Sequence, residues 1–217
     1  MNTVRSFLAI KLDLQTARAL AEAQILLKNR CADAGIEVAW VPPPNIHVTM
    51  LFLGSVNSPL VTALKDMLKP AISDTPIFEL RSAGLGIFPD PQQPKIIWAG
   101  ISEEDEALTA FHKKVSDGLT EAGFQLDTKP FQAHVTLGRI KGGNVEALEA
   151  CLAENAETVW GTTSVRNLYC YRSDLSPAGA EYHQLWRLPL SNRGRANRSR
   201  QNQSPSSDRG REGNENR

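Results

Sequence analysis

The sequence predicts an α+β fold of two lobes related by a pseudo-twofold axis. Two observations support this prediction. The order strand–helix–strand–helix–strand occurs twice along the chain, as an internal duplication would produce. The tripeptide His-Val-Thr also occurs once in each repeat, at His47–Thr49 and at His134–Thr136. We therefore expect residues 1–190 to form one bilobal domain with intertwined lobes, rather than two independent domains.

The first repeat follows from its apolar runs and from the residues that interrupt them. Asp13 stands where a helix N-cap would be, and Gly35 is a natural end for that helix. Three consecutive prolines from Pro42 forbid a helix because they fix φ and remove backbone donors. The predicted elements are a strand at 7–10, a helix at 14–31, strands at 38–41 and 46–53 (the latter ending at Gly54), a helix at 59–68 and a strand at 77–85.

The second repeat shows the same order. Ser102 is a candidate N-cap with Asp105 in the capping-box position, and Gly123 ends the same helix. The predicted elements are a strand at 96–101, a helix from 102 to 123, a strand at 133–140, a helix at 145–152, a strand at 162–171 and a last strand at 182–190.

The C-terminal segment 191–217 differs in composition from the rest of the chain. It holds seven of the 24 basic residues and three of the 24 acidic ones, so it carries +4 and residues 1–190 carry −4. A mildly acidic body argues against a broad basic groove for long nucleic acids, but it allows an enzyme that grips one phosphate at a strand end. Since residues 191–217 contain almost nothing apolar, we expect a disordered tail. An Arg-rich tail could contact RNA non-specifically, but a solvated terminus without a specific role is the commoner outcome.

The cysteines and the hydrophobic segments bear on the cellular location. Cys31, Cys151 and Cys170 form neither a disulfide framework nor a zinc spacing, which favours a reducing compartment. The N-terminal residues lack a signal-peptide pattern, and no stretch approaches the roughly 20 apolar residues of a membrane helix. We expect a cytoplasmic, soluble monomer that does not bind membranes.

Each His-Val-Thr unit places a polar pair on one face of its strand. Because side chains alternate along a strand, the His and the Thr two residues later share a face, about 6.6 Å apart, and the Val points into the core. If a twofold axis relates the lobes, the two pairs face each other across a cleft. Two hydroxyls there could hold phosphate oxygens while the imidazoles flank the phosphorus.

Two histidines supply what metal-free cleavage of a phosphodiester requires. One imidazole must be neutral and accept a proton, and the other must be protonated and donate one, and a pKa of about 6.5 allows both states. A lone His on a strand is more often structural, but packing alone gives no reason to repeat the His–Thr pair. A shared zinc ion would need further ligands, and neither strand has a Cys, Asp or Glu at ligand spacing. We therefore expect no metal and no other cofactor.

The motifs and their surroundings resemble the 2H phosphoesterase superfamily. More narrowly, they resemble its RNA 2′,3′-cyclic phosphodiesterase branch, historically called 2′-5′ RNA ligase. Besides the two His-x-Thr motifs, the resemblance rests on the segments Arg5–Ile10, Gly84–Pro89, Ile97–Gly100 and Phe131–Arg139. Relatives often have Arg at the position of Lys95 and Pro at that of Ala133, departures that alter no catalytic group.

The resemblance implies a reaction and a set of roles. His47 is implied as the general acid and His134 as the general base, with Thr49 and Thr136 holding the phosphate. The implied substrate is an RNA 3′ end bearing a 2′,3′-cyclic phosphate, which is hydrolysed to a 2′-phosphomonoester. The resemblance also implies a reversible 2′-5′ ligation of RNA. With the resemblance, we expect each lobe to be an antiparallel sheet with helices on its outer face and the active-site cleft between the lobes.

Several residues near the motifs have roles that the pattern leaves open. Arg139 could bind phosphate, but strict alternation puts it on the face opposite His134 unless a bulge intervenes. Phe131 and Trp98 could stack on a base, although core packing is the commoner outcome for such aromatics. Tyr182 matches a tyrosine common in the family and has no assigned role.

Two other functions stay open. The motifs fix the reaction rather than the base or the chain length, so the substrate could be another small cyclic or 2′-5′-linked nucleotide. A non-catalytic binder of RNA ends is the second alternative, but it would not need a proton-transfer pair. His112 and His183 lie outside the repeated motif, so we expect them to be structural or surface groups.

Overall fold

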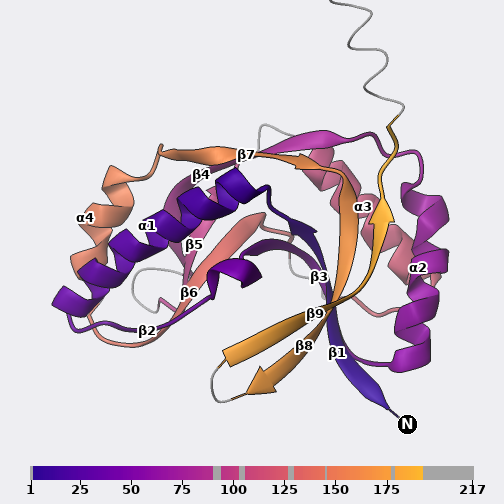
Figure 1. Ribbon diagram of the computed structural model, residues 1–217, viewed down its shortest axis with the longest axis horizontal. Helices are drawn as coiled ribbons and strands as arrows, with labels where there is room; N and C mark the ends of the chain where they lie inside the picture. Colours follow the sequence, from indigo (N-terminus) through magenta and orange to yellow (C-terminus); the bar gives the residue numbers. More distant parts are fainter. Residues whose placement is uncertain are drawn as a thin grey trace, which may run out of the picture.

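The computed structural model describes residues 2–89, 94–102, 106–126, 130–144, 146–176 and 179–192. Its elements, in chain order, are β1 (Thr3–Lys11), α1 (Leu14–Asp33), β2 (Glu37–Trp40), the short 3-10 helix η1 (Pro43–Asn45), β3 (His47–Asn57), α2 (Ser58–Ile72), β4 (Phe78–Phe88), β5 (Ile96–Ile101), α3 (Glu106–Glu121), β6 (His134–Gly142), α4 (Glu146–Glu154), β7 (Val159–Val165), β8 (Asn167–Ser176) and β9 (Gly179–Pro189) (Figure 1). Both predicted repeats are present in this order.

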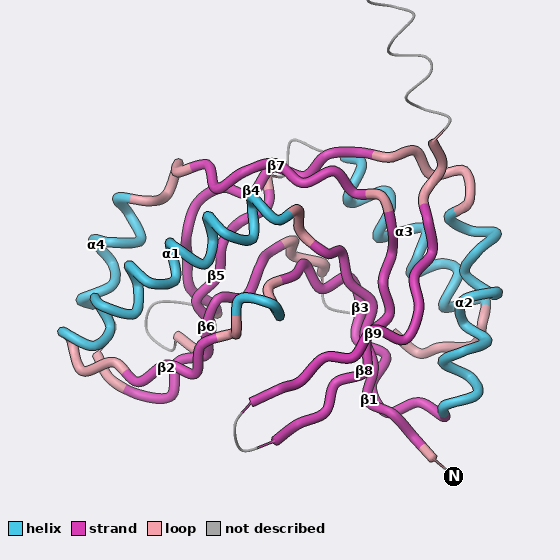
Figure 2. Tube along the Cα trace, in the orientation of Figure 1, coloured by secondary structure: helices cyan, strands magenta, loops and turns pink. Residues whose placement is uncertain are grey.

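A curled antiparallel sheet runs through the molecule (Figures 1 and 2). Its strand order is β7-β4-β5-β6-β3-β1-β8-β9, and β2 pairs additionally with β6. The two halves of the sheet meet where β3 and β6 lie side by side, at the antiparallel pair Val48–Val135. One half-sheet is therefore β7-β4-β5-β6 and the other is β3-β1-β8-β9.

Strands and helices of the two repeats are exchanged between the half-sheets. β4, which ends the first repeat, pairs with β5 and β7, whereas β8 pairs with β1 of the first repeat. α1 packs against β7 and α4, and α2 packs against α3 and against strands β1, β3 and β9 (Figure 1). The predicted α+β architecture of two antiparallel lobes is confirmed.

The helices cover the face of the sheet that lies opposite the histidines. Gln24 of α1 donates a hydrogen bond of 2.7 Å from Nε2 to the carbonyl oxygen of Leu137. His112 of α3 is hydrogen-bonded to the backbone of Met50. Leu137 and Met50 are both buried in the apolar core, as the alternation of the motif strands predicts. The opposite face of β3 and β6 is thus left open for the polar groups.

Several predicted strands are longer than expected, such as β1, which begins at Thr3, and β4, which ends at Phe88. Two other boundaries are wrong for a clear physical reason. The strand expected to end at Gly54 continues to Asn57, because Gly54 adopts a left-handed φ of 70° within a bulge instead of ending the strand. The strand expected at 162–171 is two strands, β7 and β8, with Arg166 between them. The chain crosses from one half-sheet to the other at that residue, so its pairing partners change from β4 to β1 and β9.

The last described residues pair with the segment that follows α2. Ser191 forms a parallel bridge with Pro76, and its backbone N–H donates a hydrogen bond of 2.7 Å to Thr75. Most of the predicted tail, residues 193–217, lies outside the described residues, as does Asp105 of the expected capping box. Within the described part of the chain, no helix is long and apolar enough to cross a membrane.

Candidate active site

The two His-Val-Thr units lie next to each other on paired strands. Since Val48 is opposite Val135 in an antiparallel register, His47 falls across from Thr136, and Thr49 falls across from His134. Neighbouring strands are about 4.8 Å apart. All four polar residues line one cavity of about 680 Å³. The two His–Thr pairs thus lie on adjacent strands at the junction of the half-sheets, and both pairs line the same cavity.

Both imidazoles are oriented by the same local hydrogen bond. Nδ1 of His47 lies 2.6 Å from the carbonyl oxygen of Asn45, and Nδ1 of His134 lies 2.8 Å from that of Gln132. A carbonyl oxygen only accepts, so Nδ1 carries the proton in each ring. The neutral tautomer consequently leaves a lone pair on Nε2 of each histidine, which is the atom available for proton transfer.

His47 sits in a closely packed aromatic setting. Its ring is stacked on Phe7 at 5.0 Å between centroids and meets Tyr182 edge-on at 5.4 Å. Nε2 is 2.9 Å from Oγ1 of Thr49, whose hydroxyl donates to it in the neutral tautomer. Asn45, which holds Nδ1, is itself tied to β9 by a 2.8 Å bond from Nδ2 to the carbonyl oxygen of Ala180.

The surroundings of His47 make it harder to protonate. Burial is the largest effect and lowers its pKa below 6.5, and the nearby positive form of His134 lowers it further. The hydrogen bond to Asn45 opposes both effects. His134 is partly exposed and meets the ring of Phe88 edge-on at 5.2 Å. In the free protein, therefore, the half-buried His47 favours the neutral form.

Arg139 reaches the cavity because β6 contains a bulge. Without a bulge, strict alternation would place Arg139 on the face opposite His134. On β6, Thr136 pairs with Trp98 and Gly138 pairs with Ile97, so Leu137 is the extra residue. Both Leu137 and Gly138 are buried, and the next residue, Arg139, returns to the face of His134. Arg139 is exposed and lines the cavity, and none of the described carboxylates forms an ion pair with it.

Three further residues that line the cavity had no role assigned from the sequence. Arg5 and Phe52 come from β1 and β3, and Tyr182 comes from β9. Arg5 shares the face of Phe7 by simple alternation, so the pattern of β1 could have revealed it. Phe52 is 66% exposed, and alternation from His47 predicts that it points into the core. A bulge at Met50, where Leu51 pairs with Leu8 but Thr49 pairs with Ala9, reverses the alternation.

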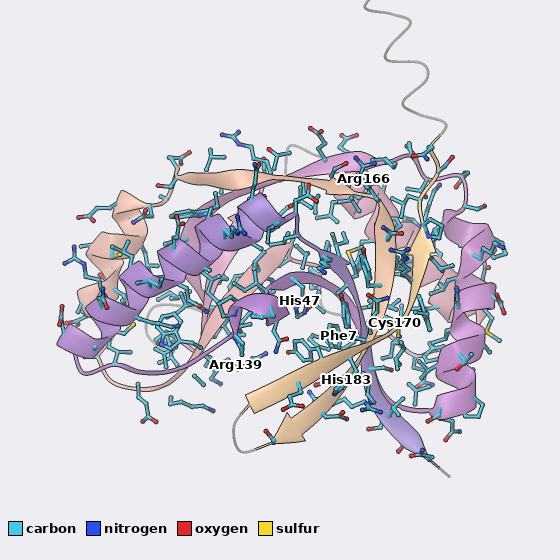
Figure 3. The ribbon with its side chains drawn as sticks, in the orientation of Figure 1. Phe7, His47, Arg139, Arg166, Cys170 and His183 are labelled. Carbon is cyan, nitrogen blue, oxygen red and sulfur yellow. The ribbon has the colours of Figure 1, made fainter. Side chains whose placement is uncertain are left out.

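The other candidate aromatics and histidines do not line the cavity. Trp98 stacks on Phe88 at 4.9 Å, and Phe131 stacks on His112 at 3.9 Å. His183, which is labelled in Figure 3, is exposed, and its Nε2 lies 3.3 Å from a carboxylate oxygen of Asp174. Among the described residues, no three His, Cys, Asp or Glu side chains are grouped as a metal site would require.

Comparisons with known proteins agree with the motifs. The family model of the 2′-5′ RNA ligase superfamily matches residues 14–176. The chain is 32% identical to an RNA 2′,3′-cyclic phosphodiesterase of Archaeoglobus fulgidus over 84% of this chain and 98% of that protein. It is 31% identical to a protein of the same name from Aeropyrum pernix over 78% of this chain and 96% of that one.

A solved structure has the same fold. The protein TT0787 of Thermus thermophilus superimposes with a TM-score of 0.70 at 25% identity, covering 86% of this chain and 97% of that one. Together with the paired motifs, these matches show that the chain belongs to the 2′-5′ RNA ligase superfamily, a branch of the 2H phosphoesterases.

Proposed function

We propose that this protein hydrolyses 2′,3′-cyclic phosphate ends of RNA to 2′-phosphomonoesters. The observation that carries the proposal is the pairing of Val48 with Val135, which places both His-Val-Thr motifs on adjacent strands that line one cavity. Relatives in Archaeoglobus and Aeropyrum carry the name of this activity. A volume of about 680 Å³ suits one nucleotide, and cavities of this size are usual for small ligands.

In the proposed reaction, the two imidazoles act in opposite directions. Nε2 of His134 takes a proton from water, and the water oxygen forms a bond to phosphorus. The bond between phosphorus and the 3′ oxygen breaks, and His47 gives its proton to that oxygen. One water is consumed, and the pair returns to its starting state by exchanging one proton with solvent. The same steps in the same direction, with a 5′ hydroxyl in place of water, would form a 2′-5′ linkage.

The remaining cavity groups hold the phosphate. The hydroxyls of Thr49 and Thr136 lie one on each motif strand, where they can donate to two different phosphate oxygens. Arg139 and Arg5 supply positive charge from β6 and β1, and a guanidinium group can bind two phosphate oxygens at once. Since all of these groups come from one chain, a monomer suffices for the proposed activity.

The acid role of His47 depends on the substrate. Without ligand, burial keeps the pKa of His47 low and its ring neutral. An anionic phosphate within 4–6 Å favours the charged imidazole and raises the pKa, and this effect is strongest in a buried site. The binding of the cyclic phosphate would therefore load His47 with the proton that it later gives to the 3′ oxygen.

The test is incubation with a short RNA ending in a 2′,3′-cyclic phosphate, in the presence of a chelator. The expected product is the 2′-phosphomonoester, identified by chromatography against 2′- and 3′-phosphate standards. A 3′-phosphate would reverse the assignment of the leaving oxygen. Activity that is lost in chelator and restored by zinc would favour a metal site, and no product at all would favour a non-catalytic binder of RNA ends.

A further inference from the structure

A second cavity, of about 720 Å³, opens beside the candidate active site. It lies between the end of β1, the first turns of α1, the short helix η1 and the start of β8, and it shares no lining residue with the cavity of the histidines. The boundary between the two is the segment from η1 to His47, since Ile46 lines one cavity and His47 the other. Figure 2 shows η1 between α1 and the β8–β9 hairpin.

A row of aromatic rings connects the two cavities. His47 stacks on Phe7 at 5.0 Å, Phe7 on Tyr171 at 5.5 Å, and Tyr171 on Tyr169 at 6.0 Å. The first two rings line the histidine cavity and Tyr169 lines the second one. These rings come from adjacent strands β3, β1 and β8, so the open face of the sheet continues from one cavity into the next.

The second cavity is basic although residues 1–190 are acidic overall. Lys11, Arg18 and Arg166 line it and are exposed, and none of the three is ion-paired with a carboxylate among the described residues. The acidic lining residue Asp13 is engaged, because its Oδ2 accepts a hydrogen bond of 2.9 Å from the backbone of Ser164. In Figure 3, His47 lies between Arg139 on one side and Arg166 on the other.

The same cavity also offers apolar surface. Leu14 at the start of α1 is 65% exposed, and Pro43, Pro44 and Ile46 line the side formed by η1. Unpaired cations next to an aromatic ring and apolar side chains are the combination that binds single-stranded nucleic acid, where phosphates meet the charges and bases stack on the rings. A lone phosphate or sulfate would make no favourable contact with the apolar side chains.

We propose that this second cavity binds the RNA nucleotides immediately upstream of the terminal cyclic phosphate. The distance between the two cavities suits neighbouring nucleotides of one strand. Phe7 in the histidine cavity and Lys11 in the second cavity are four residues apart on β1, about 13 Å at 3.3 Å per residue. Tyr169 stacks on an upstream base, and Arg18 and Arg166 neutralise upstream phosphates. This proposal rests on the proposed function, since it assumes that the terminal phosphate occupies the histidine cavity.

The experiment compares a cyclic mononucleotide with a four-nucleotide RNA that ends in the same cyclic phosphate. Arg18→Ala and Arg166→Ala should each raise the KM for the tetranucleotide at least about fivefold and leave kcat/KM for the mononucleotide within about twofold. Each should also reduce the steepness of the salt dependence of the tetranucleotide KM by about 0.7 in log–log slope. Tyr169→Ala should raise the KM for the tetranucleotide more than Tyr169→Phe does, because the phenylalanine keeps the ring.

Matched controls are Arg81→Ala and Lys65→Ala, exposed residues of β4 and α2 that line neither cavity. A parallel arm measures equilibrium binding of the same tetranucleotide by fluorescence anisotropy, so the proposal is decided even if no RNA is hydrolysed. If the protein does not hydrolyse the tetranucleotide but still binds it, and Arg166→Ala weakens that binding, the proposed function is rejected and the upstream site is kept. If the Arg18 and Arg166 variants bind and cleave the tetranucleotide as the controls do, the upstream site is rejected.

Discussion

Val48 of β3 pairs with Val135 of β6, and this pair brings each histidine beside the threonine of the other motif. Neither half-sheet holds a complete site, because one supplies His47 and Thr49 and the other supplies His134 and Thr136. The duplicated motif thus becomes useful only where the two halves of the sheet meet. The proposed chemistry depends on that junction.

Replacement of either histidine should abolish most of the activity. His47→Gln and His134→Gln are expected to lower kcat/KM for a cyclic-phosphate RNA by roughly 10²–10⁴-fold each, because each removes one proton-transfer group. Circular dichroism and thermal unfolding should stay close to wild type. His183→Gln, on the exposed part of β9, is the matched control and should keep full activity. Near-normal turnover in either motif variant contradicts the mechanism.

Burial of His47 should make the protein less stable in mild acid. Since its folded pKa lies below 6.5, the unfolded chain takes up a proton first as the pH falls, so the free energy of unfolding decreases from about pH 6.5 downwards. His47→Gln should remove part of that decrease, as measured by urea unfolding at pH 7.5 and pH 5.

The comparison variant for this measurement is His112→Gln. The pKa of His112 is also lowered, mainly by burial, so it contributes a separate share of the same pH dependence. The double variant His47→Gln/His112→Gln should show the smallest change in the free energy of unfolding between pH 7.5 and pH 5. An acid dependence that is unchanged in His47→Gln would mean that the histidine is not held neutral in the folded protein.

The fold and the proposed catalytic pair could be predicted from the sequence because both involve a repeat. Apolar runs, glycines and prolines located most elements, and the repeated tripeptide identified His47 and His134. The bulges at Met50 and Leu137 were not accessible, because an extra residue in a strand depends on how its partner pairs. These two bulges decide that Phe52 and Arg139 reach the cavity. The contribution of Tyr182 was equally hidden, since it depends on how β9 lies relative to β3.

Arg139 should matter for the phosphate rather than for the fold. Arg139→Ala is expected to lower kcat/KM by roughly 10- to 100-fold, because a hydrogen bond to a charged group contributes about 1.5–3 kcal/mol. Arg139→Lys should recover part of the loss, since it keeps the charge but not the two-pronged geometry. The exposed Arg81→Ala is the control, and equal kinetics of the two alanine variants would remove Arg139 from the site.

Replacement of Gly54 tests whether the bulge beside the cavity requires a glycine. A Cβ there meets no atom within 4 Å, but φ is +70°, so Gly54→Ala should cost about 1–2 kcal/mol of unfolding free energy through the backbone alone. Gly142→Ala is the matched control, because its Cβ also meets nothing within 4 Å and its φ lies outside the strained range. Urea denaturation of both variants measures the difference, and equal stabilities would show that the bulge tolerates a side chain.

The division of labour between the histidines is tested most directly by changing the leaving atom. A substrate whose 3′ bridging oxygen is replaced by sulfur leaves as a thiolate and needs no proton. His47→Gln should therefore cleave this substrate at a rate close to wild type, whereas His134→Gln should stay inactive because water still needs a base. Rescue of His134→Gln instead would exchange the two roles, and rescue of neither variant would contradict acid–base catalysis by this pair.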